Sequence, residues 1–382
     1  MKIAIEAQRI FRPKKHGMDI VALELIKHLQ LIDKVNEYYI LVKSDDDRNI
    51  IPETKNFHII EVPGKTYPVW EQYYLPKVLK RLSPDILHCT SNTAPIFSPV
   101  PTILTLHDIL FMKHIDFKRG TWYQRFGNLY RRLVVPNVLK KCNRIITVSE
   151  FEKREIAECL LLSENQIDVV YNSYSPIFKW ISDPDELQKS RKKYNLPEKF
   201  VLYLGNTHPN KNIRNVLKAF GLLQREYKAD ISLVIPDIGS QFLERILHEI
   251  NEPALKAKIC LTGYVPNSEL VYLYNAATIF LYPSFYESFG IPILESMACG
   301  TPVIASKTGA MPEVSGCGAV ITDPGDPNHI KESIQGLLQD SEQYNTYQML
   351  GLKRSTSFSW EKTANQVKKI YEEVYQNIDN KI

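Results

Sequence analysis

The 382-residue sequence lacks a long hydrophobic run, closely spaced cysteines and a strong net charge. No segment approaches the 18 or more apolar residues that a membrane-spanning helix needs. The first residues, MKIAIEAQRI, alternate in polarity and are not typical of a signal peptide. The six cysteines are scattered along the chain, which argues against both a zinc cage and a disulfide framework. We therefore expect a cytoplasmic protein without a structural metal.

The formal net charge of +4 is too small to indicate a nucleic-acid partner, but the charge is unevenly distributed. Residues 113–144 contain nine Lys and Arg and a single acid, Asp116. Six aromatic residues lie in or beside this stretch. Such a surface suits anionic lipid headgroups or a lipid-phosphate acceptor, and therefore contact with the inner face of the plasma membrane. The alternative is an ordinary solvated helix face.

Short β-rich runs alternate with helical patterns along the chain, which predicts βαβ units around parallel sheets. The length favours two domains, and a Ser-, Pro- and charge-rich stretch over 173–197 separates two series of strands. We predict an α/β protein of two Rossmann-like, doubly wound domains over residues 1–175 and 176–359, with a helix over 360–382 that could pack back on the first. Ligands bind such sheets at the carboxyl ends of the strands, so the cleft between the domains is the expected site.

The predicted strands are short and rich in β-branched or aromatic residues. In the first half of the chain they are 2–7, 38–43, 57–62, 85–89, 102–107 and 144–149, and in the second half 200–205, 230–237, 258–263, 278–284, 302–306 and 318–322. The clearest helix start is at Ser149, whose side chain can cap the amide three residues further on.

The second series of strands opens with a strand that ends at Gly205, a polar loop and an amphipathic helix. Unpaired amides and the helix dipole favour an anion at such a helix start. Lys211 lies in this loop, where its charge could neutralise a diphosphate. A solvated surface lysine is the alternative interpretation.

A denser group of polar and small residues follows in segment 282–300. Gly290 permits close approach of the backbone to a ligand, and the amides of Phe289–Ile291 are expected to face the cleft. Glu287 in the loop and Glu295 about one turn into the helix could accept hydrogen bonds from the vicinal hydroxyls of a ribose or a sugar. A pair of acids that merely stabilise the helix dipole is the alternative.

The segment ESFGIPILESMACGTPVIAS, residues 287–306, resembles the signature of family 4 glycosyltransferases, in which seven residues separate two glutamates. The loop GNTHPNKN resembles that family's donor-phosphate loop, and TLHD resembles its first-domain catalytic segment. TVSEFEKREI and FSWEKTA resemble further stretches of the family. The resemblance therefore extends over nearly the whole chain.

This resemblance implies a GT-B fold, a nucleotide diphosphate sugar as donor, no required metal or other cofactor, and transfer with retention at the anomeric carbon. The residues that match the family's catalytic positions are His107, Asp108, Lys211 and Glu287. Those that match its donor-binding positions are Gly17, Gly205, Asn206, Lys211, Tyr264, Val265, Ser288, Phe289, Gly290, Ile291 and Glu295.

The resemblance also implies roles for individual residues. Lys211 would stabilise the departing diphosphate, Glu295 would hold the ribose hydroxyls and Glu287 would hold the donor sugar. His107 would contact the transferred sugar from across the cleft, with Asp108 beside it. The loop at 263–266, which contains Tyr264 and Val265, would line the nucleobase.

Two features depart from the family's pattern. Family members commonly pair the loop lysine with an arginine, whereas this chain has Asn206 and Asn210 in that loop. Arg214 or Arg9 could supply the missing charge. The first-domain loop also lacks adjacent glycines, since it contains only Gly17.

The expected function is that of a retaining glycosyltransferase, which moves a hexose of mannose or glucose type to a glycan or lipid-linked acceptor in cell-surface polysaccharide synthesis. Two alternatives remain open, a nucleotide-sugar 2-epimerase and a non-catalytic nucleotide-sugar-binding protein. A third is that Asp45–Asp47 hold a metal ion with the donor, as in the GT-A fold of other glycosyltransferases.

Overall fold

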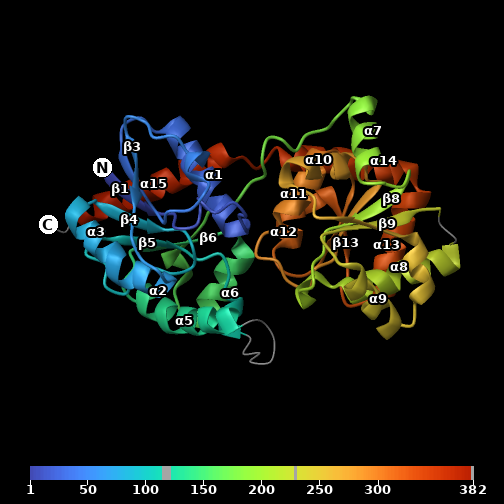
Figure 1. Cartoon of the computed structure of the whole chain (residues 1–382), viewed down its shortest axis with the longest axis horizontal. Coiled ribbons are helices and arrows are strands. Elements are labelled where there is room, and N and C mark those ends of the chain that lie inside the picture. The colour runs from blue at the N-terminus through green and yellow to red at the C-terminus, as the bar shows by residue number, and fades with distance from the viewer. Residues whose placement is uncertain (114–121, 228–229, 380–382) are drawn as a thin grey trace. The chain divides into compact units, whose positions relative to one another are not determined.

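The computed structural model describes residues 1–113, 122–227 and 230–379, and the chain divides into two compact units (Figure 1). Unit 1 comprises Met1–Asn172 and Ser359–Ile382, and unit 2 comprises Ser173–Phe358. Each unit is a parallel β-sheet covered by helices. Within the described part of the chain, no helix is both long and apolar enough to cross a membrane.

Unit 1 contains a seven-stranded sheet in the order β3-β2-β1-β4-β5-β6-β7, with every pair parallel. Its strands are β1 (Lys2–Glu6), β2 (Glu37–Val42), β3 (Phe57–Glu61), β4 (Ile86–Cys89), β5 (Thr102–Thr105), β6 (Arg144–Thr147) and β7 (Ile167–Val169). The six predicted runs all form strands. The edge strand β7 was not predicted, because a run of only three residues is hard to distinguish from a loop.

The helices of unit 1 lie on both faces of this sheet. They are α1 (Gly17–Ile32), α2 (Tyr67–Val69), α3 (Leu75–Leu82), α4 (Leu110–Lys113), α5 (Trp122–Leu139), α6 (Glu150–Leu160) and α15 (Trp360–Asp379). A π-helical turn, Trp70–Tyr74, joins α2 to α3. The predicted cap of α6 is present, since the Ser149 side chain accepts a hydrogen bond from the Glu152 amide at 3.1 Å.

The last helix, α15, packs on the unit 1 sheet beside α1 (Figure 1). Its buried face joins the core through Ala364, Val367, Ile370, Tyr371 and Val374. A buried polar contact reinforces this packing.

That contact is made by His88 on β4, whose Nδ1 lies 2.6 Å from the hydroxyl of Tyr371. The other ring nitrogen, Nε2, lies 2.7 Å from Oγ1 of Thr105. Burial lowers the pKa of His88 to about 3, so the imidazole is neutral at physiological pH. Between about pH 6.5 and pH 3 the imidazole is protonated in the unfolded chain but stays neutral in the folded protein. The free energy of unfolding therefore decreases as the pH is lowered through this window.

Unit 2 contains a six-stranded, all-parallel sheet in the order β10-β9-β8-β11-β12-β13. Its strands are β8 (Phe200–Tyr203), β9 (Ser232–Pro236), β10 (Ile259–Gly263), β11 (Ile279–Tyr282), β12 (Val303–Ser306) and β13 (Ala319–Thr322). All six lie within or next to the predicted runs. Strands with both faces covered read as continuous apolar runs, which is why these were visible in the sequence.

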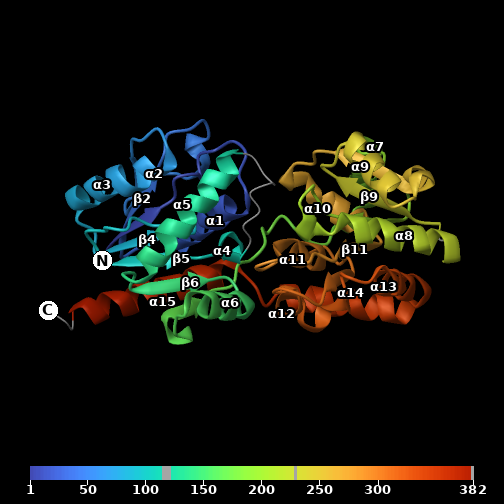
Figure 2. The same ribbon diagram turned by 90° about the horizontal axis from the view of Figure 1, so that it is seen from below.

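The helices of unit 2 again cover both faces (Figure 2). They are α7 (Pro184–Lys193), α8 (Ile213–Tyr227), α9 (Ser240–Glu249), α10 (Asn267–Ala276), α11 (Ile291–Ala298), α12 (Met311–Ser315), α13 (Pro327–Gln339) and α14 (Ser341–Ser355). In each sheet the strand order reverses once, between β1 and β4 and between β8 and β11. These reversals are the positions at which doubly wound sheets bind ligands.

Replacing Tyr371 by Phe is expected to lower the free energy of unfolding by about 1–3 kcal/mol, because Nδ1 of His88 would be left buried without its partner. Chemical denaturation monitored by circular dichroism measures this loss. Tyr227→Phe, at the more exposed end of α8, is the control and is expected to change little. Equal stability of Tyr371→Phe and the wild type would show that the buried contact does not hold α15 in place.

Candidate active site

The loops that follow β8 and β11 meet at the reversal point of the unit 2 sheet. The amide of Phe285 donates to the carbonyl of Asn210 at 2.7 Å. The side-chain amide of Asn212 donates to the carbonyls of Pro283 (2.9 Å) and Pro324 (2.6 Å). Asn212 adopts a left-handed conformation with φ of 65°, which asparagine tolerates well. The bonds to Asn210 and Pro283 hold the two loops together, and the bond to Pro324 adds the loop after β13.

Lys211 and Glu287, one from each loop, form an ion pair with 2.7 Å between Nζ and Oε1. The side chains are only 23% and 17% exposed. Lys211 Nζ also donates to the hydroxyl of Tyr282 at 2.9 Å. Burial alone would lower the pKa of Lys211, but the neighbouring Tyr282 and Glu287 groups outweigh it and raise the pKa. Lys211 is therefore a fixed positive charge in a partly dehydrated site.

Gly205 is required by the packing beneath this loop. A Cβ at this position would lie 2.2 Å from Cε1 of Tyr203, so no other residue fits without displacing the ring. The Tyr203 hydroxyl in turn donates to the backbone carbonyl of Lys211 at 2.5 Å. The absence of a side chain at Gly205 thus allows Tyr203 to support the segment that presents Lys211.

Glu295 lies in α11 and is buried, with 8% of its surface exposed. Burial raises its pKa to about 7, against the opposing effect of a hydrogen bond from the Tyr274 hydroxyl at 2.8 Å to Oε2. The rings of Phe280 and Tyr274 pack edge to face beneath it. A buried carboxyl group that is close to its titration point is typical of a binding or catalytic site.

A glycine in the left-handed region lies directly before α11. Gly290 precedes the helix with φ of 99°, a conformation that residues with a Cβ rarely adopt. Ile291 is the first helical residue, and the first amides of a helix have no acceptor one turn earlier. Ser288 and Phe289 precede Gly290, and Phe289 is buried edge to face against Phe358, with ring centroids 5.9 Å apart.

Gly309, in the loop after β12, is a site residue that the sequence did not reveal. It has φ of 64°, and a Cβ there would lie 2.8 Å from the carbonyl oxygen of Glu287. The next amide, that of Ala310, donates to the same oxygen at 3.0 Å. The only signal in the sequence was a glycine after a strand, which is common in turns. Tyr274, Tyr282 and Tyr203 were missed for a similar reason, since they read as core aromatics.

The remaining donor-side candidates differ in how exposed they are and in the partners that their side chains contact. Val265 is buried and Tyr264 is 62% exposed, next to Gly263 with φ of 70°. The Asn206 side chain is used within its own loop, where Oδ1 accepts from the His208 amide at 2.8 Å. Arg214 forms an ion pair with Glu249. Arg214 therefore already has a carboxylate partner on the surface.

Unit 1 contains the other candidates. His107 follows β5 and is buried, with Nε2 2.9 Å from the Thr90 carbonyl. Burial lowers its pKa, so the ring is neutral. Asp108 accepts hydrogen bonds from the Asn92 side chain (3.3 Å) and the Leu110 amide (3.1 Å). Gly17 begins α1, and a Cβ there would meet no atom within 4 Å.

Next to these residues lies a buried carboxyl group that sequence analysis also missed. Glu71, in the π-helical turn, accepts hydrogen bonds from the hydroxyls of Tyr67 at 2.8 Å and Thr93 at 2.5 Å. It also accepts from the Tyr130 hydroxyl and, at 2.8 Å, from the Gln72 side chain. This network ties α5 to the turn, because Tyr130 belongs to α5.

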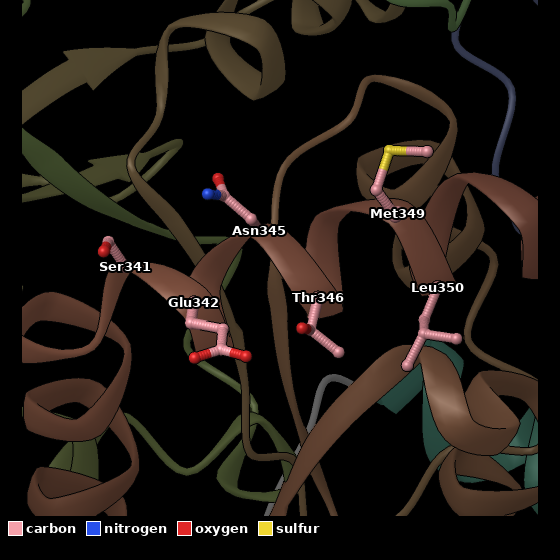
Figure 3. Close-up of a pocket in the computed structure, with 6 residues that line it drawn as sticks. All are labelled: Ser341, Glu342, Asn345, Thr346, Met349 and Leu350. Carbon is pink, nitrogen blue, oxygen red and sulfur yellow. The ribbon is translucent and has the colours of Figure 1, made fainter.

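The acidic run Asp45–Asp47 is not arranged as a metal site. Asp45 and Asp46 are exposed, and Asp47 forms an ion pair with Lys15. Over the residues that the structure describes, no cluster of three or more His, Cys, Asp or Glu has the geometry to hold a metal. An open depression of about 580 Å³ lies against α14 (Figure 3), lined by Ser341, Glu342, Asn345, Thr346, Met349 and Leu350. It includes none of the candidate residues.

Comparison with known proteins assigns the chain to a class. Residues 185–354 match the family model "Glycosyl transferases group 1", and residues 16–176 match "Glycosyltransferase Family 4". The sucrose-phosphate synthase tll1590 from Thermosynechococcus elongatus has a similar fold, with a TM-score of 0.75 at 19% identity, covering 98% of this chain and 99% of that chain. Anabaena Alr3699/HepE, solved with UDP and glucose, gives 0.75 at 17% identity, covering 98% and 100%.

Two curated relatives are similar in sequence. O-antigen chain mannosyltransferase B of Escherichia coli is 34% identical over 270 residues, covering 70% of this chain and 69% of that protein. Serotype-specific mannosyltransferase WbdA of Escherichia coli is 26% identical over 301 residues, covering 75% of this chain but only 36% of that longer protein.

The two parallel α/β sheets and these likenesses define a glycosyltransferase of the GT-B fold. The chain belongs to glycosyltransferase family 4. The expected fold class and family are thereby confirmed, and the alternative in which Asp45–Asp47 serve a GT-A fold is wrong.

Gly309→Ala is expected to weaken binding of a nucleoside diphosphate at least about tenfold, because a Cβ there must push the Glu287 backbone aside while φ is positive. Isothermal titration calorimetry measures the affinity. The matched control is Gly239→Ala, where φ is −78° and a Cβ meets no atom within 4 Å. Unchanged affinity in Gly309→Ala would mean that the position of Glu287 does not matter for binding.

Proposed function

We propose that this glycosyltransferase moves a hexose of mannose or glucose type from a nucleotide diphosphate sugar to a glycan or lipid-linked acceptor, with retention, in cell-surface polysaccharide synthesis. The observation that carries the proposal is the partly buried ion pair Lys211–Glu287 at the reversal point of the unit 2 sheet. The names of the relatives, which are mannosyltransferases, and the UDP and glucose bound to Alr3699/HepE support it.

The chemistry requires stabilisation of a leaving diphosphate. When the anomeric C–O bond breaks, its electron pair stays on the diphosphate oxygen and the sugar gains oxocarbenium character. Fixed donors aimed at the phosphate oxygens then give the largest rate advantage. Lys211 supplies a positive charge, and the amide of Ile291, the first residue of α11, lies at a helix N-terminus, which favours anions.

Donor binding would replace Glu287 by the diphosphate as the partner of Lys211. In the free protein its ammonium is neutralised by Glu287. A diphosphate would replace that carboxylate, and Glu287 would then accept hydrogen bonds from the hydroxyls of the donor sugar. The acceptor hydroxyl would add on the face from which the diphosphate departs, and its proton would pass to the departing phosphate oxygen. Because the acceptor attacks the same face of the sugar that the diphosphate leaves, the configuration at the anomeric carbon is retained.

Positive charge at the leaving group would come from protein groups in this scheme, so we propose that no metal is required. Neither Asn206 nor Asn210 brings a charge, Arg214 forms an ion pair with Glu249, and Arg9 lies in unit 1 with its guanidinium 5.1 Å from the ring centroid of Tyr67. Lys211 would therefore carry a larger share of the stabilisation than in a site with an additional arginine. On the unit 1 side, we propose that neutral His107 contacts the transferred sugar and that Asp108 orients the segment.

The proposed setting is the cytoplasm, where sugar nucleotides are the donors. A lipid-linked acceptor would require the enzyme to work at a membrane surface, and contact with the inner face of the plasma membrane through residues 113–144 is part of this proposal. Of that stretch, residues 114–121 lie outside the described part of the chain.

Lys211→Ala is expected to reduce turnover at least about a hundredfold, because one charged donor to the leaving group is lost. Steady-state transfer with mannose and glucose nucleotides as donors measures the effect. Lys218→Ala, which removes an exposed lysine of the same loop–helix segment on α8, is the matched control and should retain wild-type turnover.

Two further measurements accompany this experiment, one on metal dependence and one on donor without acceptor. Excess EDTA should leave turnover unchanged if no metal takes part. Incubation with donor alone should leave the sugar configuration intact, whereas an epimerase would convert it. Wild-type turnover in Lys211→Ala would contradict the proposed role of this lysine.

Donor affinity is expected to rise with pH up to about 7 and then level off. The pKa of Glu295 is raised to about 7 by burial, and hydrogen bonds from ribose hydroxyls would favour its ionised form. Below pH 7 binding must therefore release a proton, and affinity should fall by up to about tenfold per pH unit. Calorimetry in buffers of different ionisation enthalpy measures the proton release.

Glu295→Gln is the control for this pH effect, because Glu6 in unit 1 also has a pKa raised to about 7 by burial. The variant should bind donor more weakly at pH 8 and lose the pH dependence. A pH dependence that survives in Glu295→Gln would assign the proton to another group and remove Glu295 from the ribose site.

A further inference from the structure

Asn92, in the loop after β4, is hydrogen-bonded to both candidate residues of unit 1. Its Oδ1 accepts a hydrogen bond from the backbone amide of His107 at 2.6 Å. Its Nδ2 donates to Oδ2 of Asp108 at 3.3 Å. A single side chain therefore contacts two consecutive residues, the pair to which the proposed function gives the sugar-facing role in this unit.

The amide of His107 needs this partner because the pairing of the sheet ends before it. Strands β4 and β5 end at Cys89 and Thr105, and the Asn92 amide donates to the Thr105 carbonyl at 3.1 Å just beyond them. His107 lies two residues after β5 and is only 5% exposed, so water does not satisfy a backbone amide at this depth. The Asn92 side chain takes the place of the missing strand partner.

The position favours asparagine over other residues. Its backbone is left-handed, with φ of 64°, a conformation that asparagine and aspartate tolerate better than most residues with a Cβ. The side chain must also accept a hydrogen bond from an amide and donate one to a carboxylate. Of these two residues only asparagine has a side-chain amide group, which does both.

The ring of His107 is held separately from its backbone. Burial lowers the pKa of His107, so the imidazole is neutral. Nε2 lies 2.9 Å from the carbonyl of Thr90, and because a carbonyl only accepts, Nε2 carries the proton. Nδ1 is then the atom that can accept a hydrogen bond from a sugar hydroxyl. Thr90 thus orients the ring, and Asn92 fixes the backbone that carries it.

We infer that Asn92 is a positioning residue for sugar transfer, which holds the backbone of His107 and the carboxylate of Asp108 in one arrangement. At 1% exposure it does not reach a substrate itself. The inference rests on the proposed function, which gives His107 the contact with the transferred sugar. Because Asn92 acts through unit 1 residues, its replacement should affect turnover rather than the binding of a nucleotide to unit 2.

Asn92→Asp tests the inference with a change of nearly the same shape. The variant keeps the tolerance of the left-handed backbone and the acceptor for the His107 amide, but it places a second carboxyl group beside Asp108. Two carboxyl groups this close share a proton at low pH, and that proton restores a donor between them. When the shared proton is lost at higher pH, the two negative charges repel and displace Asp108.

We expect the ratio of turnover numbers, variant over wild type at saturating substrates, to fall at least about tenfold between about pH 5.5 and about pH 8, since a small displacement of a positioned group has an effect of this size or larger. Other titratable groups lie near this segment, namely Asp19 on α1, His88 on β4 and Glu6 at the end of β1. They are common to both proteins, so the ratio removes their contribution.

Asn36→Asp is the matched control in the same unit. Asn36 is 5% exposed and its Nδ2 donates to Oδ2 of Asp33 at 2.7 Å, so the substitution creates the same kind of carboxyl pair. Asn36 precedes β2, at the amino ends of the strands, whereas Asn92 follows β4 at their carboxyl ends. The control should lose thermal stability as the pH rises but keep a constant turnover ratio.

A second variant, Asn92→Asp/Asp108→Asn, leaves only one carboxyl group in the contact and should show no fall of the ratio with pH. Titration with GDP and UDP at each pH verifies that every variant is folded. A flat ratio in Asn92→Asp would overturn the inference, as would an equal fall in Asn36→Asp or in the double variant. Absence of hexose transfer by the wild type would instead contradict the proposed function on which the inference rests.

Discussion

A positive charge that is largely removed from water must have a partner, and the partner of Lys211 determines how unit 2 is organised around its candidate site. Glu287 supplies that partner across the reversal point between β8 and β11, where two loops meet because their strands are neighbours. Three further sets of contacts support this ion pair. Gly205 leaves room for Tyr203, Asn212 bonds the second loop, and Gly309 packs against the Glu287 backbone. An ion pair that is largely removed from water contributes little net stability, so its value here is more easily understood as a charge that is held ready for a ligand.

The candidate residues of the two units differ in charge. Unit 2 presents Lys211, Glu287 and the titratable Glu295, which suit a diphosphate and vicinal hydroxyls. Unit 1 presents a neutral His107, and its buried Glu71 is satisfied by four donors. The same Glu71 network anchors α5 to the polar interior of unit 1 through Tyr130.

Sequence reasoning recovered most of the fold because both sheets are covered on two sides, and strands of this kind read as short apolar runs between helical patterns. It also named Lys211 and Glu287, which the structure brings together in an ion pair, because charged residues beside Gly and Pro at a predicted strand end are conspicuous; the donor-binding role of Glu295 stays a prediction. It missed β7, which is too short to have a pattern. It missed Tyr203, Tyr274, Tyr282 and Gly309 because their importance depends on contacts between distant loops. Nothing local in the sequence distinguishes a tyrosine that bonds Lys211 from one that fills the core.

The central claim is that Lys211 and its surroundings form a pyrophosphate site, and the most direct test compares nucleoside diphosphates with the corresponding monophosphates by titration calorimetry. The account predicts one bound nucleotide per chain, a clear preference of the wild type for the diphosphate, and loss of that preference in Lys211→Ala. No affinity for any nucleotide, or an equal preference in wild type and variant, would contradict it.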